Sequence, residues 1–394
     1  MTERRWKVVI IGAGGVQAQA MLAGAARGTD VSGWLAVDLR WRPEARAATQ
    51  ALGIRTVEED ALADPGKLRE LTADTEIVAN FAGPYYRTGT LVLDAAIDTR
   101  THYLDICDDA DATLPMLDPA RTAAAEEAGV TALIGMGSSP GTTNILIRAA
   151  VDHLGPVENV DISWTVDVDD VANAALRHFW HCFNLVDPDG TTHPVSTWED
   201  LEQRTVDFPG TVGRQVVVRL AHPEPLTIPR FLPVKNCGNF GAITPYESMV
   251  TAWGLAHAVD PQRREVSDAT LDAAVAVFSH YRDTRPATAR LGSGLQIDVH
   301  TGGNGLRFAS GAPTPMEDAT GIPAAAGLLM LQEGKVPEVG VIAPEVLSPA
   351  EFFTTLRRVS TGGGGLGLYR LEDGRTGERL RIRDLIRLDR ATES

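Results

Sequence analysis

The first part of the chain alternates between short apolar runs and longer Ala-rich or amphipathic runs. Apolar runs rich in β-branched residues, each bounded by glycine or polar residues, predict buried parallel strands, and the runs between them predict helices. Strands are expected at residues 7–11, 34–37, 75–81, 101–109 and from 130 onward. Because strand and helix follow one another repeatedly, the pattern predicts a doubly wound parallel sheet of the Rossmann type.

The pattern changes beyond residue 155. Runs of alternating or β-branched residues at 157–168, 214–220, 293–301 and 305–311 predict a mostly antiparallel or mixed sheet. The fold class expected is therefore α/β, with a Rossmann sheet followed by an α+β substrate domain. In the tail, Asp373-Gly374 predicts a hairpin turn, for which a dimer contact or an arm over the active site is a hypothesis.

A glycine-rich turn, residues 12–16, follows the first predicted strand directly. A helix is expected from Gln17, and the second strand ends in Asp38. In dinucleotide-binding folds the glycines allow a tight turn and a close approach to the diphosphate, the helix N-terminus binds the phosphates, and the acid accepts the ribose hydroxyls. A glycine turn of another α/β protein is the alternative. The third glycine position of the pattern is occupied by Gln17, which should push the helix outward or direct its amide towards the cofactor.

Asp38 also bears on the choice of cofactor. A carboxylate repels a 2′-phosphate, so NAD is favoured, whereas Arg40 or Arg42 could receive that phosphate and keep NADP as the alternative. Ligands of such sheets gather at the carboxyl ends of the strands. The cofactor-binding residues predicted from these ends are Gly12, Ala13, Gly14, Gly15, Val16, Asp38, Leu39, Arg40, Asn80, Phe81, Ala82, Gly83 and Pro84.

Three residues are candidates for proton transfer. Asp105 lies at a strand end, where a turn or cap role is equally plausible. His178 forms an i, i+3 pair with His181 in the helical run 171–183, although core or surface histidines are more common than site histidines. Lys235 is one of only four lysines, and an exposed loop lysine is its alternative interpretation.

The loop Ser138–Asn144 precedes a predicted helix, so hydroxyls and N–H groups there could bind an anion, or could simply cap the helix. Arg230 and Arg282 are candidate carboxylate clamps, with surface arginines as the alternative interpretation. The substrate residues predicted are Tyr85, Tyr103, Ser138, Gly141, Thr142, Asn144 and Arg230.

Several segments carry a resemblance to a known family. They are GAGGV at 12–16, NFAGPYY at 80–86, HYLD at 102–105, GMGSSPGTTN at 135–144, HPEPLTIPR at 222–230 and EDATGIPAAAGLLMLQEGKV at 317–336. In their order and spacing the chain resembles the saccharopine dehydrogenase-like (saccharopine reductase) family, which includes lysine 6-dehydrogenases and carboxynorspermidine dehydrogenases.

The resemblance implies oxidation or reduction at a carbon–nitrogen bond, and a chain that returns to its first domain near its end. The domains expected are a dinucleotide-binding domain, residues 1–145 and about 318–394, and a substrate, catalytic and dimerisation domain, residues 146–317.

Composition narrows the classes of function. The chain has 394 residues and a net charge of -16 with no basic stretch, which excludes nucleic acid and anionic membranes as partners. Three separated cysteines, Cys107, Cys182 and Cys237, form no CxxC pair, so neither a disulfide framework nor a metal site is expected. No apolar run is long enough to span a bilayer, and the N-terminal run lacks a signal-peptide cleavage site, which predicts a cytoplasmic protein.

The first functional hypothesis is a homodimeric NAD(P)-dependent oxidoreductase that acts on a C–N bond of an amino acid or a polyamine-like substrate. A carbonyl or alcohol oxidoreductase on the same scaffold is the second. A cofactor-bound regulatory protein without catalysis is the third.

Overall fold

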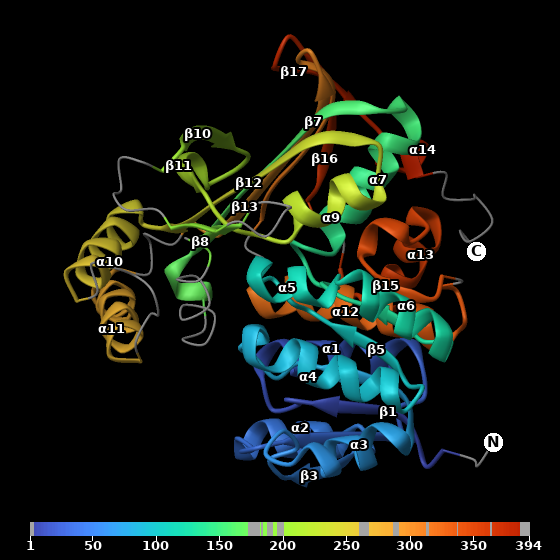
Figure 1. Ribbon diagram of the computed structural model, residues 1–394. Helices are drawn as coiled ribbons and strands as arrows, with labels where there is room; N and C mark the ends of the chain where they lie inside the picture. The colour runs from blue at the N-terminus through green and yellow to red at the C-terminus, as the bar shows by residue number, and fades with distance from the viewer. Residues whose placement is uncertain are drawn as a thin grey trace. The chain divides into compact units, whose positions relative to one another are not determined.

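The computed structural model describes residues 4–171, 182, 184–186, 192–194, 201–259, 268–286, 291–312, 315–336, 338–362 and 365–386. The chain divides into two compact units. The first unit comprises residues 1–149, 317–363 and 386–394, and the second comprises residues 150–316 and 364–385. Each unit contains one large sheet (Figure 1).

The first unit is built on a seven-stranded sheet in which all strand pairs are parallel. Its order runs β15-β6-β5-β4-β1-β2-β3, which is the Rossmann order with one strand added at an edge. The predicted parallel sheet is confirmed. The strands are β1 (Trp6–Ile11), β2 (Trp34–Asp38), β3 (Arg55–Glu58), β4 (Thr75–Asn80), β5 (His102–Asp105), β6 (Thr131–Leu133) and β15 (Gly340–Ile342).

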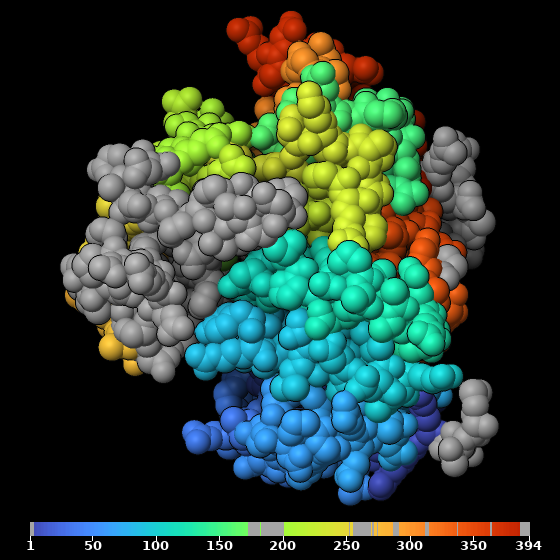
Figure 2. Space-filling view, viewed as in Figure 1, coloured from blue at the N-terminus to red at the C-terminus, as the bar shows by residue number. Residues whose placement is uncertain are grey.

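Helices connect these strands. Helices α3, α4 and α6 pack beside one another and form a surface of the unit, blue to cyan in Figure 2. Helices α12 and α13 pack against α1, where glycines Gly24, Gly28 and Gly321 allow close contact. The helices are α1 (Val16–Gly28), α2 (Pro43–Ala51), α3 (Pro65–Ala73), α4 (Tyr85–Asp98), α5 (Ala110–Met116), α6 (Pro119–Ala128), α7 (Thr142–Leu154), α12 (Met316–Gln332) and α13 (Pro349–Val359), with a 3-10 turn at Pro344–Val346.

The second unit has an eight-stranded sheet in the order β10-β11-β12-β7-β13-β14-β16-β17. Only β12 and β7 pair in parallel, so the sheet is mixed and mostly antiparallel, as predicted. Its strands are β7 (Val157–Asp167), β10 (Gln203–Phe208), β11 (Gly213–Arg219), β12 (Val234–Thr244), β13 (Ser293–Thr301), β14 (Asn304–Ala312), β16 (Gly367–Glu372) and β17 (Arg375–Leu380).

Smaller elements complete the second unit. Helix α9 (Glu224–Phe231) packs on β12, and α10 (Tyr246–Val259) packs on α11 (Asp268–Thr284). Strands β8 (Asn184–Val186) and β9 (Thr192–Pro194) form a separate pair, a 3-10 turn covers Val168–Asp170, and α14 (Ile382–Ile386) follows the last strand. The apolar core includes Val217, Val218, Phe240 and Phe278.

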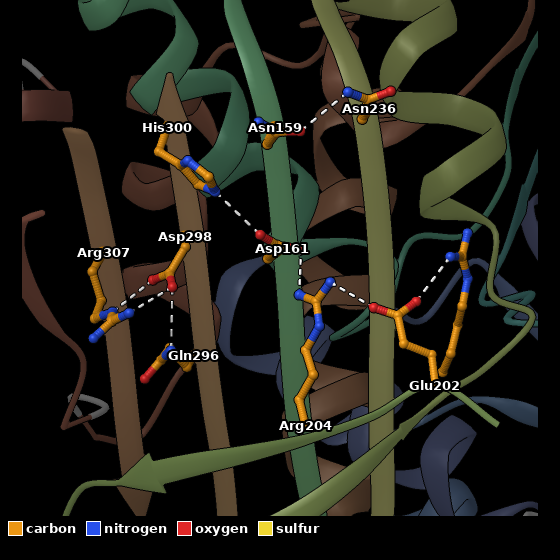
Figure 3. A network of polar contacts seen from close by, with 10 residues as sticks. Asn159, Asp161, Glu202, Arg204, Asn236, Gln296, Asp298, His300 and Arg307 are labelled. Atoms are coloured by element: carbon orange, nitrogen blue, oxygen red, sulfur yellow. Dashed lines mark hydrogen bonds and ion pairs between the residues drawn. The ribbon is translucent and has the colours of Figure 1, made fainter. Parts of the chain in front are cut away.

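One face of the second sheet carries a network of charged contacts (Figure 3). His300 Nε2 lies 3.1 Å from Asp161 Oδ2, Arg204 donates to the same carboxylate, and Arg307 binds Asp298 through two bonds of 2.6 Å. Burial would raise the pKa of Asp161, but the bonds from His300 and Arg204 hold that pKa below its usual range, and the contact with Asp161 raises the pKa of His300. This face is therefore tied together across β7, β13 and β14.

The tail departs from the prediction. Residues 364–385 were assigned with the dinucleotide-binding domain, but β16 pairs antiparallel with β14 of the second sheet and β17 pairs with β16. The physical reason is that β14 has an open edge, whose N–H and C=O groups β16 satisfies. The predicted hairpin turn is present, with φ of 48° at Asp373 and 75° at Gly374.

Within the described parts of the chain, no helix has the length and apolar character needed to cross a membrane. The predicted helical run at 171–183 falls almost wholly outside the described residues, and His178 lies there too.

Candidate functional site

Three chain segments meet at the carboxyl ends of the central strands of the first unit. In the parallel register Ile11 of β1 lies opposite Val37 of β2 and Asn80 of β4. The residues that follow each of these positions are therefore neighbours at one edge of the sheet, between β1 and β4, where the strand order reverses. This is where ligands of doubly wound sheets bind.

Glycine at position 12 is required by a close approach of backbone. Gly12 has a φ of 82°, and a Cβ there would lie 2.6 Å from the Ala82 nitrogen. The turn is also fastened to β2, because the N–H groups of Gly12 and Ala13 both donate to the Val37 carbonyl. The predicted segments 12–16 and 80–84 are thus brought together by their own backbones.

Asp38 fixes the other side of the turn. Its Oδ2 accepts the Gly14 N–H at 2.7 Å, and its Oδ1 accepts the Arg40 N–H at 2.9 Å. These two bonds hold the carboxylate at the mouth of the turn and leave further lone pairs on both oxygens.

The start of α1 presents donors without a competing acid. Gly15 caps the helix without a side-chain hydrogen bond, and the first turn holds no acidic residue. The first N–H groups of such a helix, with the positive end of its dipole, favour an anion. Val16 is 39% exposed and Leu39 57%, so two large apolar side chains flank this end of the sheet. The donors and the apolar flanks fit the diphosphate and the rings of a dinucleotide.

Among the described residues, the side chain of Gln17 forms no hydrogen bond. Gln19 forms two instead: its Nε2 donates to the Ala13 carbonyl at 2.7 Å and to Thr49 Oγ1 at 2.9 Å. Helix α1 packs closely on α12, since a Cβ at Gly321 would lie 2.4 Å from the Gln17 carbonyl oxygen. Neither Gln19 nor Gly321 was predicted, because their partners are distant in sequence or lie within the turn itself.

The two arginines after Asp38 differ in their contacts. Arg42 donates to the Gly14 carbonyl at 3.2 Å and pairs with Glu44 at 3.3 Å. Arg40 is exposed, and its guanidinium forms no hydrogen bond or ion pair with the described residues. Arg40 is therefore the better placed of the two to meet a 2′-phosphate.

Asp105 lies in a buried polar network rather than on a surface. Its Oδ1 accepts the N–H groups of Gly135 at 2.7 Å and Cys107 at 3.0 Å, and its Oδ2 accepts the Tyr103 hydroxyl at 2.7 Å. The residue is 0% exposed. Burial raises the pKa of Asp105 to about 6, against the lowering effect of these donors. The carboxyl thus joins the ends of β5 and β6.

The network continues to the β4 end. Asn80 Nδ2 donates to the Tyr103 hydroxyl at 3.3 Å, and its Oδ1 accepts the Ala82 N–H at 3.1 Å. The hydroxyl of Tyr85 donates to the Asn80 carbonyl at 3.1 Å. Burial raises the pKa of both tyrosines further above its usual value. Both predicted substrate tyrosines are therefore internal and shape the loop 80–84.

The loop 138–144 has the geometry of the helix cap that was one of the two predictions. Three of its N–H groups are already bonded within the loop: Gly141 donates to Asn144 Oδ1, Thr142 to the Gly137 carbonyl and Thr143 to the Ser138 carbonyl. A Cβ at Gly141 would lie 1.9 Å from the Gly137 oxygen, so the loop is a compact helix cap. The side chains of Ser138 and Thr142 remain partly exposed, whereas Asn144 is buried and donates to Glu345 at 2.8 Å.

With this geometry in view, residues 8–133 match the family model described as the saccharopine dehydrogenase NADP binding domain. This confirms the resemblance to the saccharopine dehydrogenase-like family for these residues. The cofactor class predicted from the turn, NAD or NADP, agrees with that description, and the chain carries the dinucleotide-binding domain of an oxidoreductase family. A search of curated proteins found no match.

Solved structures share the fold over almost the whole chain. Saccharopine dehydrogenase (L-Glu forming) from Saccharomyces cerevisiae is 14% identical with a TM-score of 0.58, covering 93% of this chain and 99% of its own. Homospermidine synthase from Legionella pneumophila, solved in complex with NAD, is 11% identical with a TM-score of 0.59, covering 95% of this chain and 93% of its own. At these identities the comparison establishes the fold.

The remaining predicted residues lie outside the matched residues 8–133. Arg230 is exposed at the end of α9, and Lys235 is exposed on β12, in a strand rather than in a loop. Both belong to the second unit. His178 is outside the described residues. Among the residues that the structure describes, no group of three or more His, Cys, Asp or Glu could hold a metal ion.

Proposed function

We propose that this protein is a NAD(P)-dependent oxidoreductase that acts on a carbon–nitrogen bond of an amino acid or a polyamine-like substrate. The observation that carries the proposal is the turn 12–16, which is fastened by Asp38 and opens onto the uncapped, acid-free start of α1. The C–N part is supported by the family of the matching domain and by the two similar structures, a saccharopine dehydrogenase and a homospermidine synthase.

The residues of the turn would hold the cofactor in three ways. The first N–H groups of α1 would bind the diphosphate, and the unused lone pairs of Asp38 would accept the ribose hydroxyls. Leu39 and Val16 would cover the adenine side. When bound, the nicotinamide supplies the hydride acceptor or donor. Because Asp38 is anionic, we propose NAD as the preferred cofactor, with NADP accommodated only through Arg40.

Asp105 would be a positioning residue and would not contact the substrate. Since its oxygens are engaged by Gly135, Cys107 and Tyr103 and no atom is exposed, its part in turnover would be to hold the ends of β5 and β6. Contact with the substrate would fall to groups of the second unit, among which Lys235, Arg230 and His178 stay predictions. A homodimer and a cytoplasmic location are further parts of the proposal.

Fluorescence titration with NADH and NADPH tests the proposal first. Binding of either below millimolar concentration is expected, and failure of both to bind would reject an oxidoreductase. The second step compares the turnover of L-lysine, other diamino acids and imine precursors with that of hydroxy acids. Turnover of the oxygen compounds alone would replace the C–N proposal by a carbonyl or alcohol oxidoreductase.

A further inference from the structure

One peptide group of the glycine-rich turn, the group that joins Ala13 to Gly14, is held at both ends by side chains. Its carbonyl oxygen, on Ala13, accepts a hydrogen bond from Gln19 Nε2 at 2.7 Å. Its N–H, on Gly14, donates to Asp38 Oδ2 at 2.7 Å. The carboxylate can come this close because residue 14 is a glycine, since a Cβ there would lie 3.0 Å from Asp38 Oδ2. Gln19 and Asp38 therefore fix one peptide group from two sides.

Gln19 reaches the turn because of its place at the start of α1. Its backbone N–H donates to the Gly15 carbonyl at 2.9 Å, which closes the first turn of the helix. Side chains on a helix lean towards its N-terminus, so the amide of Gln19 extends back to Ala13. Ala13 is 0% exposed, and its buried carbonyl needs a partner. A side chain within the helix thus fixes a residue that precedes the helix.

A second helix holds the amide of Gln19. Its Nε2 also donates to Thr49 Oγ1 of α2 at 2.9 Å, and the Thr49 hydroxyl donates in turn to the Ala45 carbonyl at 2.9 Å. Thr49 is 1% exposed, so this anchor is shielded from solvent. The amide cannot be turned round, because the Ala13 carbonyl only accepts hydrogen bonds. Helix α2 therefore fixes the orientation of the group that holds the turn.

We propose that Gln19 is a positioning residue for the cofactor. By holding the Ala13–Gly14 peptide group it keeps the Gly14 N–H on Asp38, and so keeps the Asp38 carboxylate where it receives the ribose. Gly14 has no Cβ and would otherwise allow this peptide group to rotate, which would turn the Ala13 oxygen towards the carboxylate and break both bonds. The inference rests on the proposed function and deepens it, because the preference for NAD then depends on a residue that acts through the turn.

Calorimetric titration of the full chain with NAD and NADP at about pH 8 tests this. Gln19→Glu keeps the shape of the side chain but replaces the donor to Ala13 by an acceptor. The repelled peptide group releases Asp38, so the variant should weaken NAD roughly tenfold or more and NADP by a smaller factor. The added charge acts on both cofactors, so the ratio of the two affinities isolates the effect on Asp38.

The pH dependence of this variant separates positioning from a general loss of structure. Once protonated, the introduced carboxyl group can again donate to the Ala13 carbonyl. The NAD affinity of the variant relative to the wild type should therefore recover at least about twofold as the pH falls from about 8 to about 5.

Two further variants guard against misfolding and local effects. Thr49→Val removes only the second partner of Gln19 and adds no charge, and it should weaken NAD by about two- to fivefold, again more than NADP. Gln50→Glu is the matched control, because Gln50 is exposed on α2 and donates to Thr56 instead of the turn. It should leave both affinities within about twofold of the wild type. Thermal unfolding verifies that each variant is folded.

The outcomes separate the inference from the proposed function. If the wild type binds NAD, then unchanged NAD affinity in folded Gln19→Glu, equal weakening of NAD and NADP, or no recovery in acid would overturn the inference and leave the oxidoreductase proposal standing. If Gln19→Glu does not fold, unchanged affinities in Thr49→Val would overturn the inference in the same way. Failure of the wild type to bind either cofactor would instead reject the proposed function, and the inference with it.

Discussion

Two carboxylates of the first unit, those of Asp38 and Asp105, differ in their exposure to solvent. Asp38 sits at the mouth of the glycine turn with unused lone pairs, whereas Asp105 is fully buried with three donors on its oxygens. Each is the last residue of a strand of the same parallel sheet. The difference between them is made by the neighbouring strand ends, since β6 and its loop cover Asp105. Position along a strand therefore does not determine which acid can meet a ligand.

Asp38 and Arg40 set the cofactor preference. Asp38→Ala should weaken NADH roughly tenfold or more, because two ribose hydroxyls lose a charged acceptor, and should affect NADPH less. Arg40→Ala should do the reverse. Fluorescence titration of both cofactors measures the two ratios, with Arg69→Ala on α3 as a control at a distant surface. An unchanged preference in the Asp38 variant would contradict its ribose role.

Asp105 should make stability depend on pH. Its pKa is raised on folding from 3.8 to about 6, so its stabilising contribution is complete below pH 3.8 and is lost as the pH rises through 6. Asp105→Asn removes this dependence. Relative to the wild type, the variant should therefore gain up to about 3 kcal/mol between pH 4 and pH 8.

Urea unfolding at several pH values measures that gain, and Glu70→Gln on the exposed face of α3 serves as the control. A constant difference between variant and wild type would show that Asp105 does not change its protonation on folding. The same variant bears on catalysis. If it turns over substrate as fast as the wild type, a proton-acceptor role for Asp105 is excluded.

Among the elements, helix α1 owes its position to its close contact with helix α12. A Cβ at Gly321 would meet the Gln17 oxygen at 2.4 Å and the Met21 nitrogen at 2.8 Å, both of them backbone atoms that cannot move alone. Gly321→Ala should therefore shift α1, cost about 1–3 kcal/mol and weaken NADH. Gly254→Ala, in α10 with open space around it, should be neutral or stabilising. Equal effects of the two substitutions would show that the contact is loose.

Local patterns predicted the elements of the first sheet well. The run Lys7–Ile11, the turn from Gly12 and the acid at position 38 are neighbours in sequence, so their relation could be inferred from residue types alone. What escaped prediction is contact across the sheet. That Asp105 is closed in by Gly135, or that the N–H groups near Gly141 bond to their own loop, depends on how separate strand ends meet.

For the whole molecule, the sheet of the second unit is completed by the end of the chain. Leu368 and Leu371 of β16 are 1% and 2% exposed. A chain that stops at Gly362 should therefore lose about 3 kcal/mol from the second unit, through lost burial and an exposed β14 edge, while NADH affinity stays within about twofold. Calorimetry with and without NADH measures the stability of the second unit and the affinity for NADH. A chain ending at Ile386 is the control, and identical unfolding of the two truncations would contradict the role of β16.

The family resemblance implied a return of the chain to its first domain, and α13, which packs on α1, belongs to the first unit. It did not imply that the residues after α13 would join the sheet of the second unit. The pairing of β16 with β14 joins positions about sixty residues apart through backbone bonds, which carry no sequence signature beyond the hairpin at Asp373-Gly374. Which strands pair at this separation depends on which sheet edge is open in the folded protein, and the sequence does not show that edge.

The interruption of the first unit by residues 150–316 matters while the protein is being made. A nascent chain leaves the ribosome with the first six parallel strands already made, whereas helix α12, which packs on α1 and contacts Leu104 of β5, is not yet translated. At bacterial or eukaryotic elongation rates the delay is roughly 10–30 s. During that interval the contact of Gly321 with the start of α1 is absent, so α1 can pack fully only after residue 321 has been made.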